Sequence, residues 1–261
     1  RKINEFTIAS TSQLLDPFEQ TWKTDLFTAL GIPPEIMQTV VPPGTVVGGL
    51  KPEFVQDTGL AETSVVATAS HDTAAAIAAT PGSGKNWAYI SSGTWSLVGC
   101  EVDRPIITEQ ALQSNFTNEG GVAHTTRFLK NVTGLWLLQQ CRKEWAQKKD
   151  VTYEEIAHLA GEALPFRTFI EPDWPGFMNP ATMPEAIRQF ALKTKQTVPG
   201  TIPELARCVL ESLALKYRST VKELDGLRDG PVEQIHVIGG GSQNERLCQW
   251  TADATGLPVV A

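Results

Sequence analysis

The sequence predicts an α/β fold in which a mixed sheet is flanked by helices, and three observations support this. Residues 234–238 form a short apolar run that leads through the triglycine 239–241 into a helical pattern. Residues 87–90 and 95–100 are two further apolar runs joined by a tight turn, which predicts an antiparallel hairpin. From residue 202 to 227, apolar residues recur at i, i+3, i+4 and i+7, the pattern of a long helix packed on a sheet.

Composition narrows the classes of protein that need to be considered. The chain has 261 residues, 41% of them apolar and 20% charged, which is typical of soluble α/β proteins and long enough for two domains. The net charge of -7 disfavours nucleic acid and anionic membranes as partners. No apolar run is long enough to span a bilayer. Four widely spaced cysteines without a CxxC pair predict reduced, buried thiols and a cytoplasmic protein.

Local patterns define the elements of the first third of the chain. Residues 6–9 favour a strand. Asp16 followed by Pro17 and Glu19 is typical of a capped helix start, and apolar residues at helical spacing extend the prediction to Ala29. Residues 64–68 predict a short buried strand that ends just before a helix starting near Asp72.

The remaining elements follow from the same signals. Residues 116–117 and 121–124 are candidate third and fourth strands, and a helix is expected to open near residues 131–134. Helices are also expected at residues 154–163, 184–194 and 245–255. Residues 169–184 contain four prolines and predict a long loop, which in a compact domain is usually functional or an insertion.

The domain organisation is predicted from the punctuation at residues 81–84, Pro-Gly-Ser-Gly. We expect residues 1–81 to belong to one domain and residues 82–261 to a second. The chain starts at Arg1 without a methionine and ends in a strand-like run. We therefore expect it to be a fragment of a longer protein.

Asp72 is the first candidate functional residue. It lies where a strand is predicted to end and a helix to begin, so its carboxylate can face the positive end of the helix dipole. Crevices in α/β folds open at the same edge of the sheet. The alternative is that Asp72 only caps an alanine-rich helix.

Two glycine turns form a second candidate site. Residues 91–94, Ser-Ser-Gly-Thr, join two strands, and residues 239–241 join a strand to a helix. Glycines allow backbone N–H groups to approach a phosphate or a flat ring, which a Cβ would block. Neither turn matches the P-loop or GxGxxG patterns, and each alone is equally well explained as a structural turn.

The order of these features resembles the ribonuclease H-like (actin-like ATPase) fold of actin, hexokinase and the carbohydrate kinases. Within that group the sequence resembles the FGGY carbohydrate kinases. The resemblance rests on residues 69–74, 89–97, 118–121, 129–139 and 237–244 and covers nearly the whole chain. It implies that residues 1–81 are the tail of the N-terminal, sugar-binding domain. Residues 82–261 would then be the nucleotide-binding C-terminal domain, incomplete at its end.

The resemblance also implies roles for individual residues. Asp72 would be the catalytic base that removes the proton from a sugar hydroxyl, with His71, Thr73 and Asn131 binding the sugar. Thr94, Gln139, Gly240 and Gly241 would bind ATP, with Mg²⁺ bridging its phosphates. No metal-ligating residue is assigned in the chain itself.

The implied activity is ATP-dependent phosphorylation of a ketose at its terminal hydroxyl. The resemblance in the proline loop at residues 169–180 and in the segment 129–139 implies that the sugar is L-rhamnulose, phosphorylated at O1. Two alternatives stay open at this point. One is an FGGY kinase for xylulose, ribulose, gluconate or glycerol. The other is a non-catalytic nucleotide-binding module, against which the motif around Asp72 argues. Because much of the first domain is absent, we expect the fragment alone to be inactive.

Overall fold

The computed structural model describes residues 2–147 and 150–261 and divides into two compact units. The first unit comprises Arg1–Pro81 and Glu101–Phe128, and the second comprises Gly82–Cys100 and Leu129–Ala261. Residues 101–128, which the sequence assigned to the second domain, thus pack with the first unit. The assignment of residues 1–81 and 82–261 to two domains of a kinase stays a prediction.

The first unit is built from short elements and three two-stranded sheets. Its small core gathers Phe6, Ala9 and Leu15. Its elements are β1 (Asn4–Glu5), α1 (Phe6–Ala9), the 3-10 helix η1 (Ser10–Ser12), β2 (Leu15–Asp16), β3 (Thr21–Trp22), α2 (Thr24–Leu30), the 3-10 helix η2 (Pro34–Ile36), β4 (Val40–Val41), β5 (Val46–Gly49), α3 (Pro52–Thr58), β6 (Ser64–Val66), α4 (Asp72–Ala78), α5 (Glu109–Gln113) and β9 (Thr117–Gly120).

Two predictions near the start of the chain are wrong. Residues 6–9 form helix α1, not a strand, because the Glu5 carboxylate accepts the N–H groups of Thr7 and Ile8 and caps the helix. Asp16 does not begin a long helix. Its Oδ1 accepts the N–H groups of Phe18 and Glu19 and closes a turn between β2 and β3, and the helix starts only at Thr24.

The prediction of a buried strand before Asp72 is also wrong. Strand β6 covers only Ser64–Val66, is exposed along its length, and pairs with β5 in an antiparallel two-stranded sheet. Irregular chain separates β6 from α4. Asp72 therefore does not lie at the end of a buried strand, although it does begin a helix.

A six-stranded mixed sheet has the strand order β12-β11-β7-β8-β10-β9, in which β10 spans Thr126–Thr133. Strand β11 (Gln234–Ile238) pairs in parallel with β12 (Val259–Val260) and with β7 (Trp87–Ser92). Strand β7 pairs antiparallel with β8 (Trp95–Val102), so the predicted hairpin is confirmed. The run Ala88–Ile90 is fully buried, as expected for a central strand.

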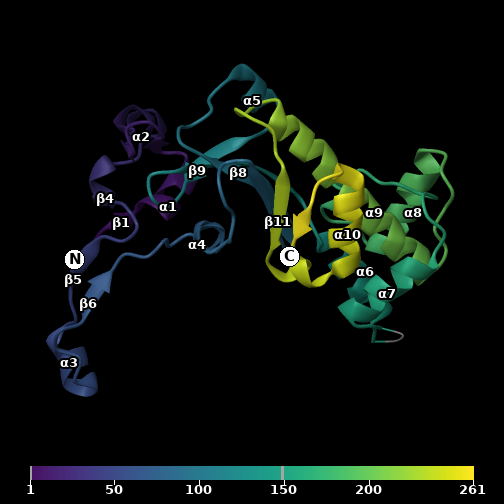
Figure 1. The fold of residues 1–261 in the computed structure, drawn as a ribbon, viewed down its shortest axis with the longest axis horizontal. Coiled ribbons are helices and arrows are strands. Elements are labelled where there is room, and N and C mark those ends of the chain that lie inside the picture. Colours follow the sequence, from purple (N-terminus) through teal and green to yellow (C-terminus); the bar gives the residue numbers. More distant parts are fainter. Residues whose placement is uncertain (1, 148–149) are drawn as a thin grey trace. The chain divides into compact units, whose positions relative to one another are not determined.

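The helices of the second unit form where apolar residues recur at helical spacing in the sequence, as predicted. Helix α9 (Ile202–Asp225) starts with a capping box at Thr201 and Glu204 and packs against α7 and α10 (Figure 1). The remaining elements are α6 (Trp136–Trp145), α7 (Tyr153–Glu162), the 3-10 helix η3 (Pro175–Phe177), α8 (Met183–Lys193), the 3-10 helix η4 (Gly240–Gln243) and α10 (Glu245–Thr255).

The chain between residues 117 and 136 differs from the prediction. The predicted third strand, residues 116–117, corresponds to β9 (Thr117–Gly120). Residues 121–124, the predicted fourth strand, instead form a turn, and the next strand is β10 (Thr126–Thr133). Ala123 and His124 have φ values of 55° and 65°, which a strand cannot contain. Asn131 consequently lies in a strand, and the helix predicted to open near it begins at Trp136.

Two further expectations concern the whole chain. Cys100, Cys141 and Cys208 are buried, Cys248 is half-buried, and none of them forms a disulfide in the described part of the chain. Among residues 2–147 and 150–261, no helix combines the length and apolar character needed to cross a membrane.

Candidate active site

Asp72 presents an exposed carboxylate at the first position of α4. Its side chain is 95% exposed, and His71 before it has the extended backbone of an N-cap residue. Asp72 Oδ1 accepts the N–H of Thr73 at 2.7 Å. Thr73 is buried, so the backbone beneath the carboxylate is held by packing while the carboxylate itself faces solvent.

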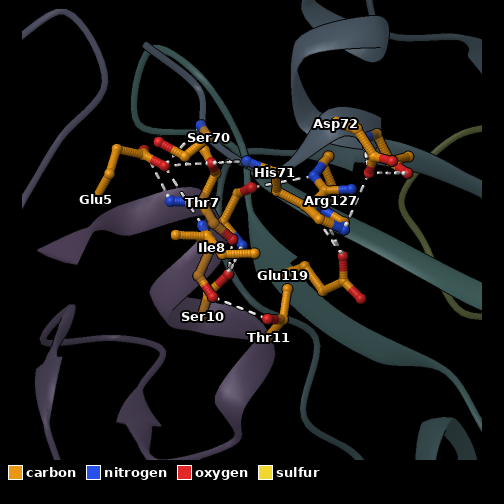
Figure 2. A network of polar contacts seen from close by, with 12 residues as sticks. Glu5, Thr7, Ile8, Ser10, Thr11, Ser70, His71, Asp72, Glu119 and Arg127 are labelled. Carbon is orange, nitrogen blue, oxygen red and sulfur yellow. Dashed lines mark hydrogen bonds and ion pairs between the residues drawn. The ribbon is translucent and has the colours of Figure 1, made fainter. Parts of the chain in front are cut away.

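The backbone leading to Asp72 is fixed by a buried carboxylate from the first residues of the chain. Glu5 Oε2 accepts the N–H of Ser70 at 2.9 Å and the hydroxyl of Thr7 at 2.5 Å. Thr7 Oγ1 in turn accepts the N–H of His71 at 3.2 Å (Figure 2). Side-chain hydrogen bonds, and not the edge of a sheet as expected, therefore hold the backbone that leads to Asp72.

The imidazole of His71 is held by a second buried group, Arg127. Arg127 Nη2 lies 2.8 Å from His71 Nδ1 and donates to Glu119 Oε2 at 2.8 Å. Its Nε donates to the carbonyl of Gly120 at 3.0 Å. Figure 2 shows the side chains of His71, Arg127 and Glu119 pointing toward one another. Sequence reasoning missed Glu5, Thr7 and Arg127 as partners, because no local pattern marks contacts between segments so far apart.

In the second unit, the hairpin turn between β7 and β8 is fixed to the start of α6. The carbonyl of Gly93 accepts the N–H of Leu135 at 2.8 Å, and the carbonyl of Thr94 accepts the N–H of Trp136 at 3.1 Å. These carbonyls satisfy N–H groups that a helix start leaves unpaired. A Cβ on Gly134 would lie 2.7 Å from the carbonyl oxygen of Gly93, so the close approach needs glycine there.

The triglycine turn follows β11 and packs on the same hairpin. Gly239 has φ 81°, and a Cβ there would lie 2.9 Å from the carbonyl oxygen of Ser92. A Cβ on Gly241 would collide with the Ser92 side chain. A Cβ on Gly240, by contrast, would meet no atom within 4 Å. Two of the three glycines therefore serve packing, and Gly240 faces open space.

A cavity of about 960 Å³ lies within the second unit beside both turns. Its walls come from the hairpin turn, α6, α7, η4 and α10, and include Gly93, Gln139, Tyr153, Gly240, Arg246 and Trp250. Its size and its mixture of apolar, aromatic and hydrogen-bonding groups are those of a site for a small organic ligand.

The predicted site residues fall into two groups, one in each unit. His71, Asp72 and Thr73 are consecutive around the start of α4. Gln139, Gly240 and Gly241 line the cavity, and Thr94 joins them through its hydroxyl, which donates to Gln139 Oε1 at 3.1 Å. Asn131 is exposed on β10 and does not line the cavity.

Metal ligands are sparse in the described residues. They contain no group of three or more His, Cys, Asp or Glu side chains placed to hold a metal ion.

Two solved kinases have a similar fold. A gluconate kinase from Lactobacillus acidophilus superposes with a TM-score of 0.74 at 18% identity, covering 99% of this chain and 51% of that one. A glycerol kinase from Plasmodium falciparum, solved with ADP, gives a TM-score of 0.69 at 12% identity, with 98% and 50% coverage. The predicted α/β fold of the actin-like ATPase class is confirmed.

Curated relatives are more similar in sequence. A rhamnulokinase from Bacteroides thetaiotaomicron is 46% identical over 261 residues, which cover 100% of this chain and 53% of that protein. A rhamnulokinase from Bacillus subtilis is 39% identical, with the same coverage. The chain thus spans about half the length of the curated relatives it matches.

Two family models match adjoining parts of the chain. Residues 1–79 match the N-terminal domain of the FGGY family of carbohydrate kinases, and residues 88–261 match the C-terminal domain of the same family. The order of the two matches agrees with the order of the motifs described above. The chain belongs to the FGGY family of carbohydrate kinases.

Proposed function

We propose that this chain forms part of a cytoplasmic, ATP-dependent kinase that phosphorylates L-rhamnulose at O1, giving L-rhamnulose 1-phosphate and ADP. The observation that carries the proposal is the exposed carboxylate of Asp72, held at the start of α4 by buried side chains. The choice of sugar is supported by the relatives named rhamnulokinase, at 46% and 39% identity.

Asp72 acts as the general base in this proposal. Its Oδ1 accepts the N–H of Thr73, which orients the carboxylate and leaves Oδ2 available for a proton. As the sugar oxygen bonds to the γ-phosphorus, the bond to the bridging oxygen of ADP breaks and the hydroxyl proton moves to Asp72. A base placed in this way contributes about 10²–10⁴-fold to the rate. His71, Thr73 and Asn131 hold the sugar hydroxyls.

ATP binds in the cavity of the second unit. The volume of about 960 Å³ suits a nucleotide, and the open space in front of Gly240 allows a ligand to approach the backbone closely. Gln139 and Thr94, joined by a hydrogen bond, supply polar groups to the nucleotide. Gly240 and Gly241 line the cavity beside Gln139.

Mg²⁺ accompanies ATP in the proposed reaction. In this proposal the ion would be bound to the triphosphate, as Mg²⁺ commonly is in nucleotide-dependent enzymes. Bound there, the ion would neutralise charge that develops on the phosphates.

The test of the function is a measurement of ADP release by the full-length protein that contains this chain, with ATP and one ketose at a time. We expect kcat/KM for L-rhamnulose to exceed that for L-fuculose, D-xylulose and L-ribulose. A site built to pair with hydroxyl groups can reject an unsuitable analogue by as much as ~10⁴-fold. A clear preference for xylulose would discard the proposed sugar, and no ADP release with any sugar would discard the kinase.

The role of Asp72 is tested by Asp72→Asn. We expect kcat to fall by about 10²-fold or more, because the amide cannot accept the proton, while ATP affinity is unchanged. The matched control is Asp25→Asn, which makes the same change in the first turn of α2, another seven-residue helix of the first unit. Turnover of Asp72→Asn close to that of the control would leave Asp72 with only a structural role at the helix start.

A further inference from the structure

Arg127 is a charged side chain that the proposed reaction does not yet use. It lies on β10 and is 0% exposed, the largest of the fully buried side chains in the described chain. Burying a guanidinium is costly unless other groups pair with it. Glu119 and the carbonyl of Gly120 accept from its Nη2 and Nε.

Arg127 is not fully satisfied by these contacts. Its Nη1 is buried and has no hydrogen-bond partner among the described residues. A buried donor without a partner costs free energy, so apolar packing would serve the stability of this position better. Arrangements that lower the stability of the fold without improving its packing are expected mainly at functional sites.

The contact that distinguishes Arg127 is the one to His71. A guanidinium is always protonated and can only donate hydrogen bonds. Because Arg127 Nη2 lies 2.8 Å from His71 Nδ1, that ring nitrogen must offer its lone pair. The proton of the neutral imidazole is then on Nε2, which lies 3.5 Å from Asp72 Oδ1.

The opposite tautomer has no suitable acceptor. A proton on Nδ1 would face the donating Nη2 at 2.8 Å. The nearest carboxylate oxygen, Glu119 Oε2, is 3.7 Å from Nδ1 and already accepts from Arg127. The geometry therefore admits one neutral form of the ring, with its N–H on the side of Asp72.

We propose that Arg127 is a positioning residue that fixes His71 as the Nε2–H tautomer and so directs one N–H donor toward Asp72 and the substrate hydroxyl. The catalytic consequence of this assignment rests on the proposed function. The tautomer of the His71 ring does not depend on it. Glu119 serves by holding the guanidinium in place, and the Glu5–Thr7 pair fixes the backbone of His71.

The first test needs neither sugar nor ATP. Long-range ¹H–¹⁵N spectra of the full-length protein, labelled at histidine, report which ring nitrogen carries the proton. The signal of His71 is identified by its loss in His71→Gln. We expect a protonated Nε2 and an unprotonated Nδ1 at neutral pH. A protonated Nδ1 in the unmodified protein overturns the proposal.

The second test removes the donor. The double variant Arg127→Met with Glu119→Gln eliminates both charges together, so that no unpaired charge is left buried. We expect its His71 spectrum to show a mixture of tautomers. Groups that orient metal-binding histidines contribute about 10- to 100-fold to activity. We expect a comparable effect here, so kcat should fall by at least about tenfold while KM for ATP is unchanged.

Two controls separate this effect from a loss of structure. Glu119→Gln alone keeps Arg127 and should keep the Nε2–H tautomer. Arg188→Lys alters another arginine that donates to a backbone carbonyl but does not touch His71, and it should change neither tautomer nor kcat. An unchanged tautomer in the folded double variant contradicts the assignment. If the double variant does not fold, the spectrum of the unmodified protein still decides the tautomer on which the assignment depends.

These results also separate the inference from the proposed function. A protein without kinase activity whose His71 tautomer responds to Arg127 would retain the positioning role and refute only the reaction. An active kinase in which His71 carries its proton on Nδ1 would retain the reaction and refute only the positioning role.

Discussion

Gly240 and Gly241 are neighbours in the chain but have different physical reasons to be glycine. Both line the cavity of the second unit. Gly241 is buried against Ser92, where a Cβ would collide with the serine side chain, whereas Gly240 faces space without an atom within 4 Å. A substitution at Gly240 therefore changes the cavity alone, and a substitution at Gly241 also disturbs the packing of β7.

This contrast gives a prediction at the scale of single residues. Gly240→Val should weaken ATP binding by about tenfold, ~1.4 kcal/mol, with an unchanged melting temperature. Gly241→Ala should lower the free energy of unfolding by about 1–3 kcal/mol, the usual cost of overpacking. Calorimetric titration with ATP and thermal melts of both variants check this. Equal melting temperatures for the two variants, or wild-type ATP affinity in Gly240→Val, would contradict it.

At the scale of elements, the proline loop between α7 and α8 is anchored through Asp173. Its Oδ1 accepts the N–H of Thr133 at the end of β10 at 2.7 Å, and its Oδ2 pairs with Lys216 of α9 at 2.7 Å. Lys216 also donates to Glu171 at 2.7 Å. One carboxylate thus joins the loop, the strand end and the long helix.

The pKa values of the pair follow from this geometry. Burial alone would raise the pKa of Asp173, but hydrogen bonds from Lys216 and Thr133 outweigh it and hold the pKa below the ordinary 3.8. Burial alone would likewise lower the pKa of Lys216, but its bonds to Asp173 and Glu171 raise it above the ordinary 10.5. The pair therefore stabilises the fold between the two ordinary pKa values.

A dependence of stability on pH is expected from these directions. The contribution of Asp173 is present above its ordinary pKa and is lost as pH falls through the lower, folded value. Asp173→Asn should therefore be destabilised at neutral pH, and the difference from the unmodified protein should shrink below about pH 4. Urea unfolding between pH 2.5 and 7 measures it, with the exposed Asp253→Asn on α10 as the control. A difference that stays constant down to the lowest pH would show that Asp173 acts through shape alone.

At the scale of the whole molecule, all four cysteines lie in the second unit, so thiol chemistry reports on that unit. Burial raises the pKa of Cys208 to about 12 and raises that of Cys141 well above its ordinary value. Burial, with Glu245 nearby, also raises the pKa of Cys248, but this side chain is only half-buried.

Alkylation should therefore proceed in a fixed order. At neutral pH we expect Cys248 to react first, and Cys141 and Cys208 only when the second unit unfolds, since both thiolate formation and access are suppressed in the native state. Mass spectrometry after timed labelling in increasing denaturant measures each site, and Cys248→Ser removes the fast phase as a control. Labelling of Cys141 as fast as Cys248 would instead show that α6 opens locally.

The sequence by itself determined the α/β class, the β7–β8 hairpin and the helices of the second unit. Helix α9 and strand β11 follow from their periodicity and from local capping and turn signals, because those interactions join residues close together in the chain. The family resemblance likewise rested on short motifs that can be read locally. Asp72 could be singled out from the sequence because it begins a helix, which is a local property.

Tertiary structure decided what the local pattern left open. Residues 6–9 form a helix because Glu5 caps it, and the same carboxylate holds Ser70, 65 positions away. Arg127 meets His71 across 56 positions, so no spacing rule could assign the tautomer of the ring. Burial of a charge and the pairing of distant polar groups depend on which segments meet in space, and only the folded chain defines that.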